Sequence, residues 1–141
     1  MNQKVYKVWK LLLNNPNQWL SVYWISSQLK LTFRQVISVI SGINSEYIEK
    51  ERTNGGVVVS LNVTDEQLIE IWRRVTREFY NIDETFIDTI RRALSSCGWL
   101  SITDIAADTG LKPIKISMAL STMDNVKHKC VDAKHLYLKE V

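Results

Sequence analysis

The sequence has little of what membrane, secreted and disulfide-stabilised proteins carry. Its 141 residues contain no run of 18 apolar residues, so no membrane-spanning helix is expected. The first residues, Met1-Asn2-Gln3-Lys4-Val5, do not open a signal-peptide apolar region. There are two cysteines, Cys97 and Cys130, which make no disulfide framework. These absences predict an intracellular, cytoplasmic protein in a reduced state.

Catalytic signatures are also missing. The sequence has no G-x-S-x-G nucleophile turn, no phosphate-binding P-loop, no H-E-x-x-H zinc motif and no cysteine pair at metal-binding spacing. Its carboxylates are scattered, with no pair set in an apolar stretch. We therefore expect a protein that is not an enzyme and that uses no cofactor.

The two histidines suggest one metal site to weigh. His128 and His135 are expected to face each other across a hairpin near Cys130, with Asp132 as a fourth ligand. Four ligands would be crowded onto one short ribbon, so we favour polar residues on a solvated strand and expect no metal.

What the chain does have is an internal repeat. Trp19-Leu20-Ser21-Val22 reappears as Trp99-Leu100-Ser101-Ile102, at an offset of 80 residues. At the same offset the apolar positions match: Ile25 with Ile105, Leu31 with Leu111, Val36 with Ile116, and Ile40 with Leu120. Self-similarity at a long period marks duplicated structural units. We predict two copies of one small domain, residues 1–63 and 83–141, joined by residues 64–82.

Each copy predicts the same order of elements: helix, short strand, helix, turn, helix and hairpin. In the first copy, Ser21 and Thr32 are expected to cap the second and third helices, and Asn54-Gly55 to turn the hairpin with positive φ angles. In the second copy, Asp83 caps the first helix, Thr103 or Asp104 starts the second, and the hairpin turns at Asp132-Ala133. The fold class is mainly α with small β-hairpins (α+β).

The second copy resembles a winged helix-turn-helix domain. The resemblance is carried by Ile105-Ala106-Ala107-Asp108-Thr109-Gly110-Leu111 with Ile116, Ala119, Leu120 and Met123. The first copy keeps the pattern as Ile25, Leu31, Val36, Ile40 and Ile43, with Lys30 where the turn glycine would stand. The resemblance implies two winged-helix domains and, with them, binding of double-stranded DNA.

The connecting segment predicts a long amphipathic helix from Thr64 to Tyr80. Its apolar stripe consists of Leu68, Ile71, Trp72, Val75 and Phe79. A stripe of this length has to be buried against the chain's own domains or in a homodimer, and we expect a dimer.

Charge favours the first copy as the one that meets DNA. Residues 1–63 carry a net charge of +4, residues 64–82 carry −1 and residues 83–141 carry zero. The resemblance implies that the third helix enters the major groove and the hairpin wing touches the backbone. The expected contacts are Lys30, Thr32, Phe33, Arg34, Gln35, Ile37, Ser38, Ser41, Lys50 and Arg52. Among them, Arg34 suits guanine or phosphate and Gln35 suits adenine.

The second copy is expected to be an auxiliary DNA contact or a protein-binding module. Its candidate residues are Lys112, Lys115, Met118, Lys127, Lys129 and Lys134. The function we expect is transcriptional regulation or genome organisation by a nucleoid-associated protein. The alternative is a protein-interaction module of a chromosome-segregation or replication assembly. Phe33, Ile37, Ile114 and Met118 favour this alternative because they would be apolar and outward-facing.

Overall fold

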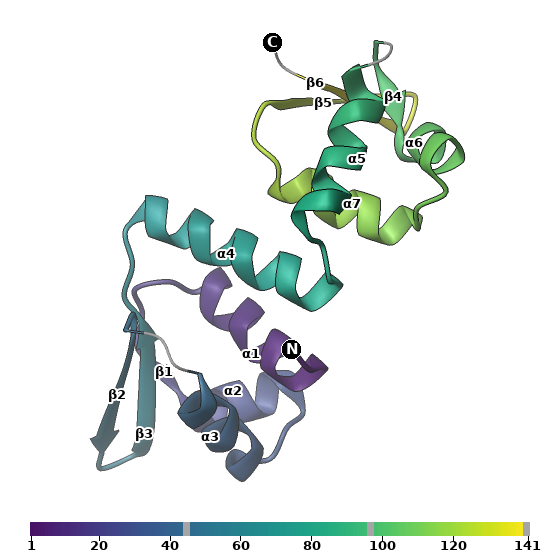
Figure 1. Cartoon of the computed structure of the whole chain (residues 1–141). Coiled ribbons are helices and arrows are strands. Elements are labelled where there is room, and N and C mark those ends of the chain that lie inside the picture. The colour runs from purple at the N-terminus through teal and green to yellow at the C-terminus, as the bar shows by residue number, and fades with distance from the viewer. Residues whose placement is uncertain (44–45, 96–97, 140–141) are drawn as a thin grey trace. The chain divides into compact units, whose positions relative to one another are not determined.

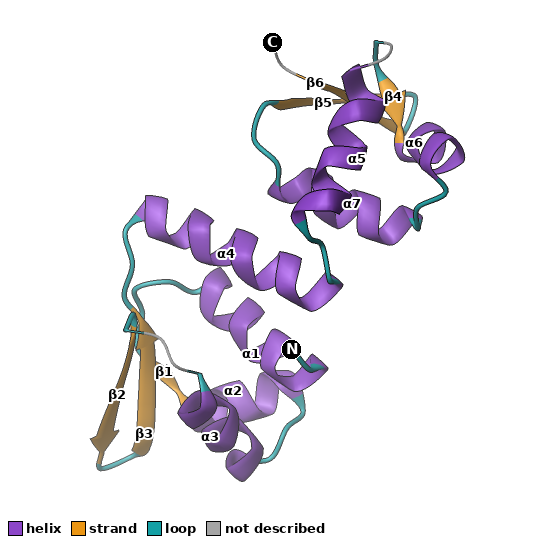
Figure 2. Ribbon diagram, viewed as in Figure 1, coloured by secondary structure: helices purple, strands orange, loops and turns teal. Residues whose placement is uncertain are grey.

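The computed structural model describes residues 1–43, 46–95 and 98–139 and divides the chain into two compact units, Met1–Val75 and Thr76–Val141. These residues form seven helices and two three-stranded antiparallel sheets, which confirms the α+β class (Figures 1 and 2). The division falls within one helix, so the segment expected to connect the copies contributes to both units. Cys97 lies outside the described residues.

The first unit begins with three helices and ends on a hairpin and a helix. Its elements are α1 (Gln3–Asn14), β1 (Leu20–Ser21), α2 (Val22–Leu29), α3 (Phe33–Gly42), β2 (Ile48–Thr53), β3 (Gly56–Leu61) and the start of α4 (Asp65–Tyr80). The sheet order is β1-β3-β2, so the short strand β1 pairs with the second strand of the hairpin. Leu20 pairs with Val59 in this register.

The second unit repeats this order. After the end of α4 come α5 (Glu84–Ser95), β4 (Leu100–Ser101), α6 (Ile102–Thr109), α7 (Pro113–Thr122), β5 (Val126–Val131) and β6 (Lys134–Lys139). The sheet order β4-β6-β5 is the same as in the first unit. The repeated apolar pattern of the sequence therefore corresponds to a repeated arrangement of elements.

Each unit encloses its own apolar core. The first core includes the fully buried Val8, Leu12, Ile25, Val36, Val59 and Leu61. The second core includes the fully buried Ile87, Ile90, Ile105, Ile116 and Ala119. In α7 Ile116, Ala119 and Leu120 are buried, as their helical spacing predicts, whereas in α3 Val36 and Ile40 are buried and Val39 and Ile43 are only partly so. In α5 Ile87 is buried and Phe86 is only partly so. Repeating apolar residues at helical and strand periods thus explain both cores.

Helix α4 gives most of its apolar stripe to the first core. Ile71 and Val75 are buried in that core, and Leu68 and Trp72 pack against it. The stripe therefore has an intrachain partner over these four residues, whereas Phe79 lies in the second unit. The homodimer expected through this helix stays a prediction.

The helix caps follow the sequence closely, with one difference. The backbone N–H of Tyr23 donates to Ser21 Oγ, and that of Phe86 donates to Asp83 Oδ1, as predicted. Helix α6, however, is capped by Ser101, whose hydroxyl accepts from the Asp104 N–H while the Asp104 carboxylate accepts from the Ser101 N–H. The expected start at Thr103 or Asp104 is wrong by one to two residues, because this reciprocal capping box begins the helix at Ile102.

The two hairpins turn in different ways. At the first, the positive φ of 120° belongs to Gly56, and not to Asn54 or Gly55 as predicted. A Cβ at Gly56 would lie 3.1 Å from the Tyr23 ring, so this position needs a glycine for two reasons. At the second hairpin Asp132 and Ala133 have φ angles of 50° and 63°, which is the two-residue turn that matches strand twist.

One arginine hydrogen-bonds to the C-terminal end of helix α7 in the second unit. Arg77 of α4 donates from Nε to Thr122 Oγ1 at 3.1 Å and from Nη2 to the Thr122 carbonyl at 3.2 Å. The Thr122 side chain is buried and donates in turn to the Ala119 carbonyl at 2.8 Å. A carbonyl at a helix end thus gains a charged donor.

Across the described ranges, no helix combines the length and the apolar character needed to cross a lipid bilayer.

Candidate nucleic-acid interface

Helix α3 begins with a capping box that uses two of the predicted site residues. Thr32 Oγ1 accepts from the Gln35 N–H at 3.1 Å, and Gln35 Oε1 accepts from the Thr32 N–H at 2.9 Å. Because the adenine-reading geometry needs both the oxygen and the nitrogen of a free amide, Gln35 is not placed for the role the sequence suggested. It fixes the start of the helix instead.

Three polar residues form the exposed face of α3. Arg34, Ser38 and Ser41 follow each other at i, i+4 and i+7 and are all exposed. The opposite face carries the buried Val36 and Ile40. A long cationic side chain and two short hydroxyls are therefore presented together, as the sequence predicted for these positions.

The two apolar residues of α3 are not the exposed patch that was expected. Phe33 and Ile37 are partly buried and pack against the first core. The Phe33 ring lies 4.7 Å, centre to centre, from the ring of Tyr23 on α2. Tyr23 covers one side of Phe33 and keeps 59% of its own surface exposed, so it presents the aromatic surface here.

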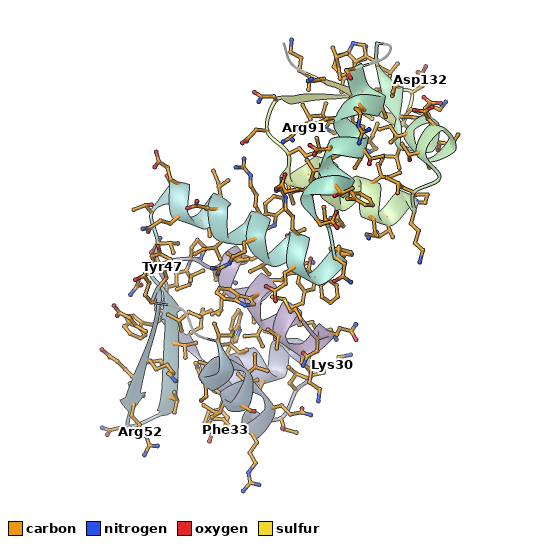
Figure 3. The ribbon with its side chains drawn as sticks, in the orientation of Figure 1. Lys30, Phe33, Tyr47, Arg52, Arg91 and Asp132 are labelled. Atoms are coloured by element: carbon orange, nitrogen blue, oxygen red, sulfur yellow. The ribbon has the colours of Figure 1, made fainter. Side chains whose placement is uncertain are left out.

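The hairpin β2–β3 separates its charges by face. Lys50 pairs with Val59 and Arg52 with Val57, and directly paired residues point to the same side of a sheet. Since Val59 is fully buried in the core, Lys50 and Arg52 lie on the side of the sheet against which the helices pack, and both side chains remain exposed. Glu49 and Glu51 alternate with them and belong to the opposite face. In Figure 3, Arg52 lies near the tip of this hairpin, while Phe33 and Lys30 lie at the start of α3 and in the turn before it.

The helices of the first unit have an unusual charge composition. The sequences of α1, α2 and α3 contain no aspartate or glutamate. Nine lysines and arginines face six acids over Met1–Val75, and these acids all lie between Glu46 and Glu70. In the described chain, no ion pair involves Lys30, Arg34, Lys50 or Arg52. Nothing on the three helices therefore neutralises the positive potential of α3.

One tyrosine at the base of this hairpin titrates above its ordinary range. The pKa of Tyr47 is raised, mainly by its hydrogen bond to Glu46 and by the negative charge of that carboxylate.

The equivalent surface of the second unit is less available. Lys115 Nζ lies 4.7 Å from the centre of the Phe86 ring, and Lys129 Nζ lies 4.2 Å from that of Trp99. Met118 packs against the second core and is not exposed, which corrects the expectation that it forms an outward patch. Of the four apolar residues expected to face outward, which are Phe33, Ile37, Ile114 and Met118, Ile114 alone is exposed, at 55% of its surface. Helices α5 and α6 contain four acids, so their charge is mixed.

The three lysines of the second hairpin share one face. Lys127 and Lys129 alternate along β5, and Lys134 pairs with Val131, which falls on the same side as both. Lys112 caps α7 without a side-chain hydrogen bond and is exposed. These four side chains remain candidates for an auxiliary contact.

The histidines lie together, as expected, on the other face of that hairpin. His128 Nε2 and His135 Nδ1 are 2.8 Å apart, and the ring of His128 stacks on that of Tyr137 at 4.9 Å. Burial raises the pKa of Tyr137. Within residues 1–43, 46–95 and 98–139, no three His, Cys, Asp or Glu residues are grouped so as to hold a metal ion.

Sequence reasoning missed the exposed aromatic residues of the first unit. Trp19, Tyr23 and Trp24 keep 46%, 59% and 39% of their surface exposed. A signal was present, because Val22, Ile25 and Leu29 define the buried side of α2 and Tyr23 and Trp24 fall off that stripe.

No protein-family model matches the sequence, and no curated protein matches it.

Proposed function

We propose that each unit is a winged helix-turn-helix domain and that the first unit binds double-stranded DNA. The order helix, strand, helix, helix, strand, strand in each unit supports this assignment. In such a domain α3 is the recognition helix and the β2–β3 hairpin is the wing. The chain would act as a transcriptional regulator or a genome-organising protein.

The observation that carries the proposal is the one-sided charge of the first unit. Arg34 projects from α3, Lys50 and Arg52 lie on the side of the wing against which the helices pack, and the three helices lack acids. DNA affinity depends mainly on neutralising phosphates with such cations. Ser38 and Ser41 add hydrogen-bond donors for phosphates or base edges.

The test is fluorescence anisotropy of a labelled random-sequence duplex at several salt concentrations. If Lys30, Arg34, Lys50 and Arg52 each neutralise a phosphate, log K falls against log salt with a slope of about −3.6. A lack of binding at low salt would overturn the proposal.

A protein-interaction module of a chromosome-segregation or replication assembly is the second candidate. The exposed Trp19, Tyr23 and Trp24 favour it, because Trp and Tyr are enriched at the centres of protein interfaces. Weak retention on heparin together with one stoichiometric protein partner from a cell extract would favour this candidate over DNA binding.

A further inference from the structure

The first unit contains a groove between α1 and the end of α2 that shares only Lys30 with the proposed DNA contacts. Its volume is about 360 Å³, and its lining includes Leu11 and Leu29 together with Lys7, Lys10 and Lys30. Both leucines are partly buried and the three lysines are exposed, so we take the leucines as the floor of the groove and the lysines as its rim.

The groove follows from the spacing of residues on α1. Lys7, Lys10, Leu11 and Asn14 stand at i, i+3, i+4 and i+7, which places them on one face of a helix. The side chains of Val8 and Leu12 point away from this face into the core.

Nothing nearby neutralises the lysines. The helices that form the groove contain no acid, and no ion pair in the described part of the first unit involves Lys7, Lys10 or Lys30. Lys10 Nζ lies 5.6 Å from the centre of the Tyr6 ring, a contact that orients the ammonium group and leaves its charge intact. Three like charges around one small groove repel each other, and a bound anion would relieve that repulsion.

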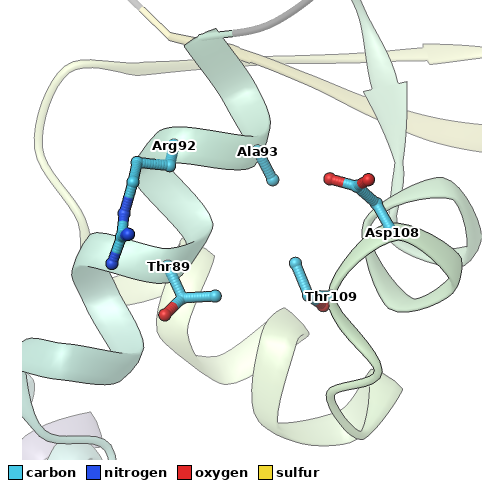
Figure 4. Close-up of a pocket in the computed structure, with 5 residues that line it drawn as sticks. All are labelled: Thr89, Arg92, Ala93, Asp108 and Thr109. Carbon is cyan, nitrogen blue, oxygen red and sulfur yellow. The ribbon is translucent and has the colours of Figure 1, made fainter.

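The second unit supplies an internal comparison. A pocket of about 470 Å³ lies at the matching place between α5 and α6, lined by Thr89, Arg92, Ala93, Asp108 and Thr109 (Figure 4). At the offset of 80 residues, Asp108 matches Gln28 and Thr109 matches Leu29. The same place in the scaffold therefore holds one acid and one base in the second unit, with a threonine where the first unit has Leu29. Within the described residues, the lining of this second-unit pocket includes no lysine and no leucine.

Position 30 is a second difference between the two units, because Lys30 stands where the second unit has Gly110. Lys30 adopts the left-handed conformation with φ 54° and ψ 40°, which the matching Gly110 adopts without steric cost. A lysine is thus held at a position where the fold favours glycine, and its side chain lines the groove.

We propose that this groove binds an acidic segment of a partner protein, in which carboxylates flank an apolar side chain. The carboxylates would pair with Lys7, Lys10 and Lys30, and the apolar side chain would cover Leu11 and Leu29. The amides of Asn14 and Gln28, which also line the groove, suit the polar backbone of an extended segment. A DNA backbone satisfies the lysines equally well but offers no apolar group for the floor, so charge and apolar surface together favour a peptide.

The test uses the full chain and a short fluorescein-labelled peptide that alternates glutamate pairs with leucines. The groove variant is Lys7→Gln with Lys10→Gln, neither of which is among the proposed DNA contacts. The matched control is Lys4→Gln with Arg74→Gln, which removes the same charge from the same unit outside both the groove and the proposed DNA contacts. All four side chains are exposed, and circular dichroism checks that each variant keeps its helices.

We expect the peptide to bind the wild-type chain saturably at low salt. The groove variant should weaken that binding by at least about fivefold, and the control by less than about twofold. A peptide with serines in place of the leucines should also bind at least about threefold more weakly.

Three results would overturn the proposal: no binding of the leucine peptide, equal losses in the groove variant and the control, or equal affinity for the serine peptide. Titration of labelled duplex DNA into the groove variant separates this proposal from the proposed function. Duplex affinity that falls as far as peptide affinity would assign the groove to nucleic acid instead. Unchanged duplex affinity with weakened peptide binding would support two separate surfaces.

Discussion

Lys30 and Gly110 occupy the same position in the two units and share a left-handed backbone. Their φ angles are 54° and 73°, and each backbone N–H donates to the carbonyl four residues earlier, Ser26 and Ala106 respectively. Each residue thus ends the second helix of its unit and turns the chain toward the third. Glycine makes this turn without strain, whereas lysine places a Cβ close to the backbone.

The first prediction concerns two single variants, in each of which one of these residues is replaced by its counterpart from the other unit. Lys30→Gly should raise the free energy of unfolding of the first unit by about 1 kcal/mol, because it removes the left-handed strain. Gly110→Lys should lower that of the second unit by a similar amount. Chemical denaturation of each variant measures both effects. A lower free energy of unfolding in Lys30→Gly would mean that contacts of the lysine side chain stabilise the first unit by more than its left-handed backbone destabilises it.

The second prediction concerns the two faces of the first hairpin. Replacing Lys50 and Arg52 by glutamine should weaken duplex binding and reduce the salt slope by about 1.8, since two phosphate contacts are lost. Replacing Glu49 and Glu51 by glutamine changes the opposite face of the same strand and should leave the slope unchanged. Anisotropy titrations at several salt concentrations measure the slopes. Equal effects of the two double variants would show that the face of the hairpin does not matter.

A third prediction follows from the capping box of α6. Hydrogen bonds from the backbone N–H and the side chain of Ser101 lower the pKa of Asp104 below its ordinary value. A carboxyl group whose pKa is lower in the folded state stabilises the fold above its unfolded pKa and loses that effect as pH falls through the folded pKa. Asp104→Asn keeps the acceptor oxygen and removes the titration.

We therefore expect Asp104→Asn to reduce the protection of α6 amides against hydrogen exchange at neutral pH. The difference from the wild-type chain should shrink as the pH is lowered through the acid range. Asp108→Asn serves as the control, because this exposed carboxylate on the same helix makes no capping hydrogen bond. A difference that stays constant with pH would contradict the role of the ionised Asp104.

The fourth prediction tests Arg77. Arg77→Lys keeps the positive charge but replaces the planar guanidinium, which donates to both the Thr122 hydroxyl and its carbonyl, and should destabilise the second unit by about 1–2 kcal/mol. Glu84→Gln removes only the exposed ion pair with Arg77, which is 3.6 Å long, and should cost less than about 0.5 kcal/mol. Thermal unfolding of both variants gives the comparison. Similar losses of stability in the two variants would show that Arg77 stabilises the second unit through its ion pair with Glu84, and not through its hydrogen bonds to Thr122.

Much of the fold was predictable because its signals are local. The apolar stripes of α1, α3 and α4, the Ser21 and Asp83 caps and the position of the second hairpin depend on residues within a few positions of each other. The start of α6 was mispredicted although Ser101 matches Ser21 at the offset of 80 residues, because Thr103 and Asp104 are also residue types that cap helices. Residue type alone does not rank three neighbouring cap candidates.

The candidate site was predicted less completely, for a different reason. The exposure of Arg34, Ser38 and Ser41 follows from helical spacing and was foreseen. Two features were not predicted: Gln35 is held in the capping box of α3, and the ring of Tyr23 packs on that of Phe33. Each depends on which of several possible hydrogen bonds or contacts the side chain makes. The Gln35 contact is local to the start of α3, whereas the contact between Tyr23 and Phe33 joins two helices.

The internal repeat, the order of helices and strands and the charge imbalance of the first copy can be read from the sequence alone, because periodicity and composition are properties of neighbouring residues. The folded structure was needed to show that Lys50 and Arg52 lie on the side of the sheet that faces the core, that Lys30 takes a left-handed turn and that three lysines line one groove. These features depend on strand register and on the packing of helices that are distant in the chain. Register and packing are set by the whole core, so no local pattern specifies them.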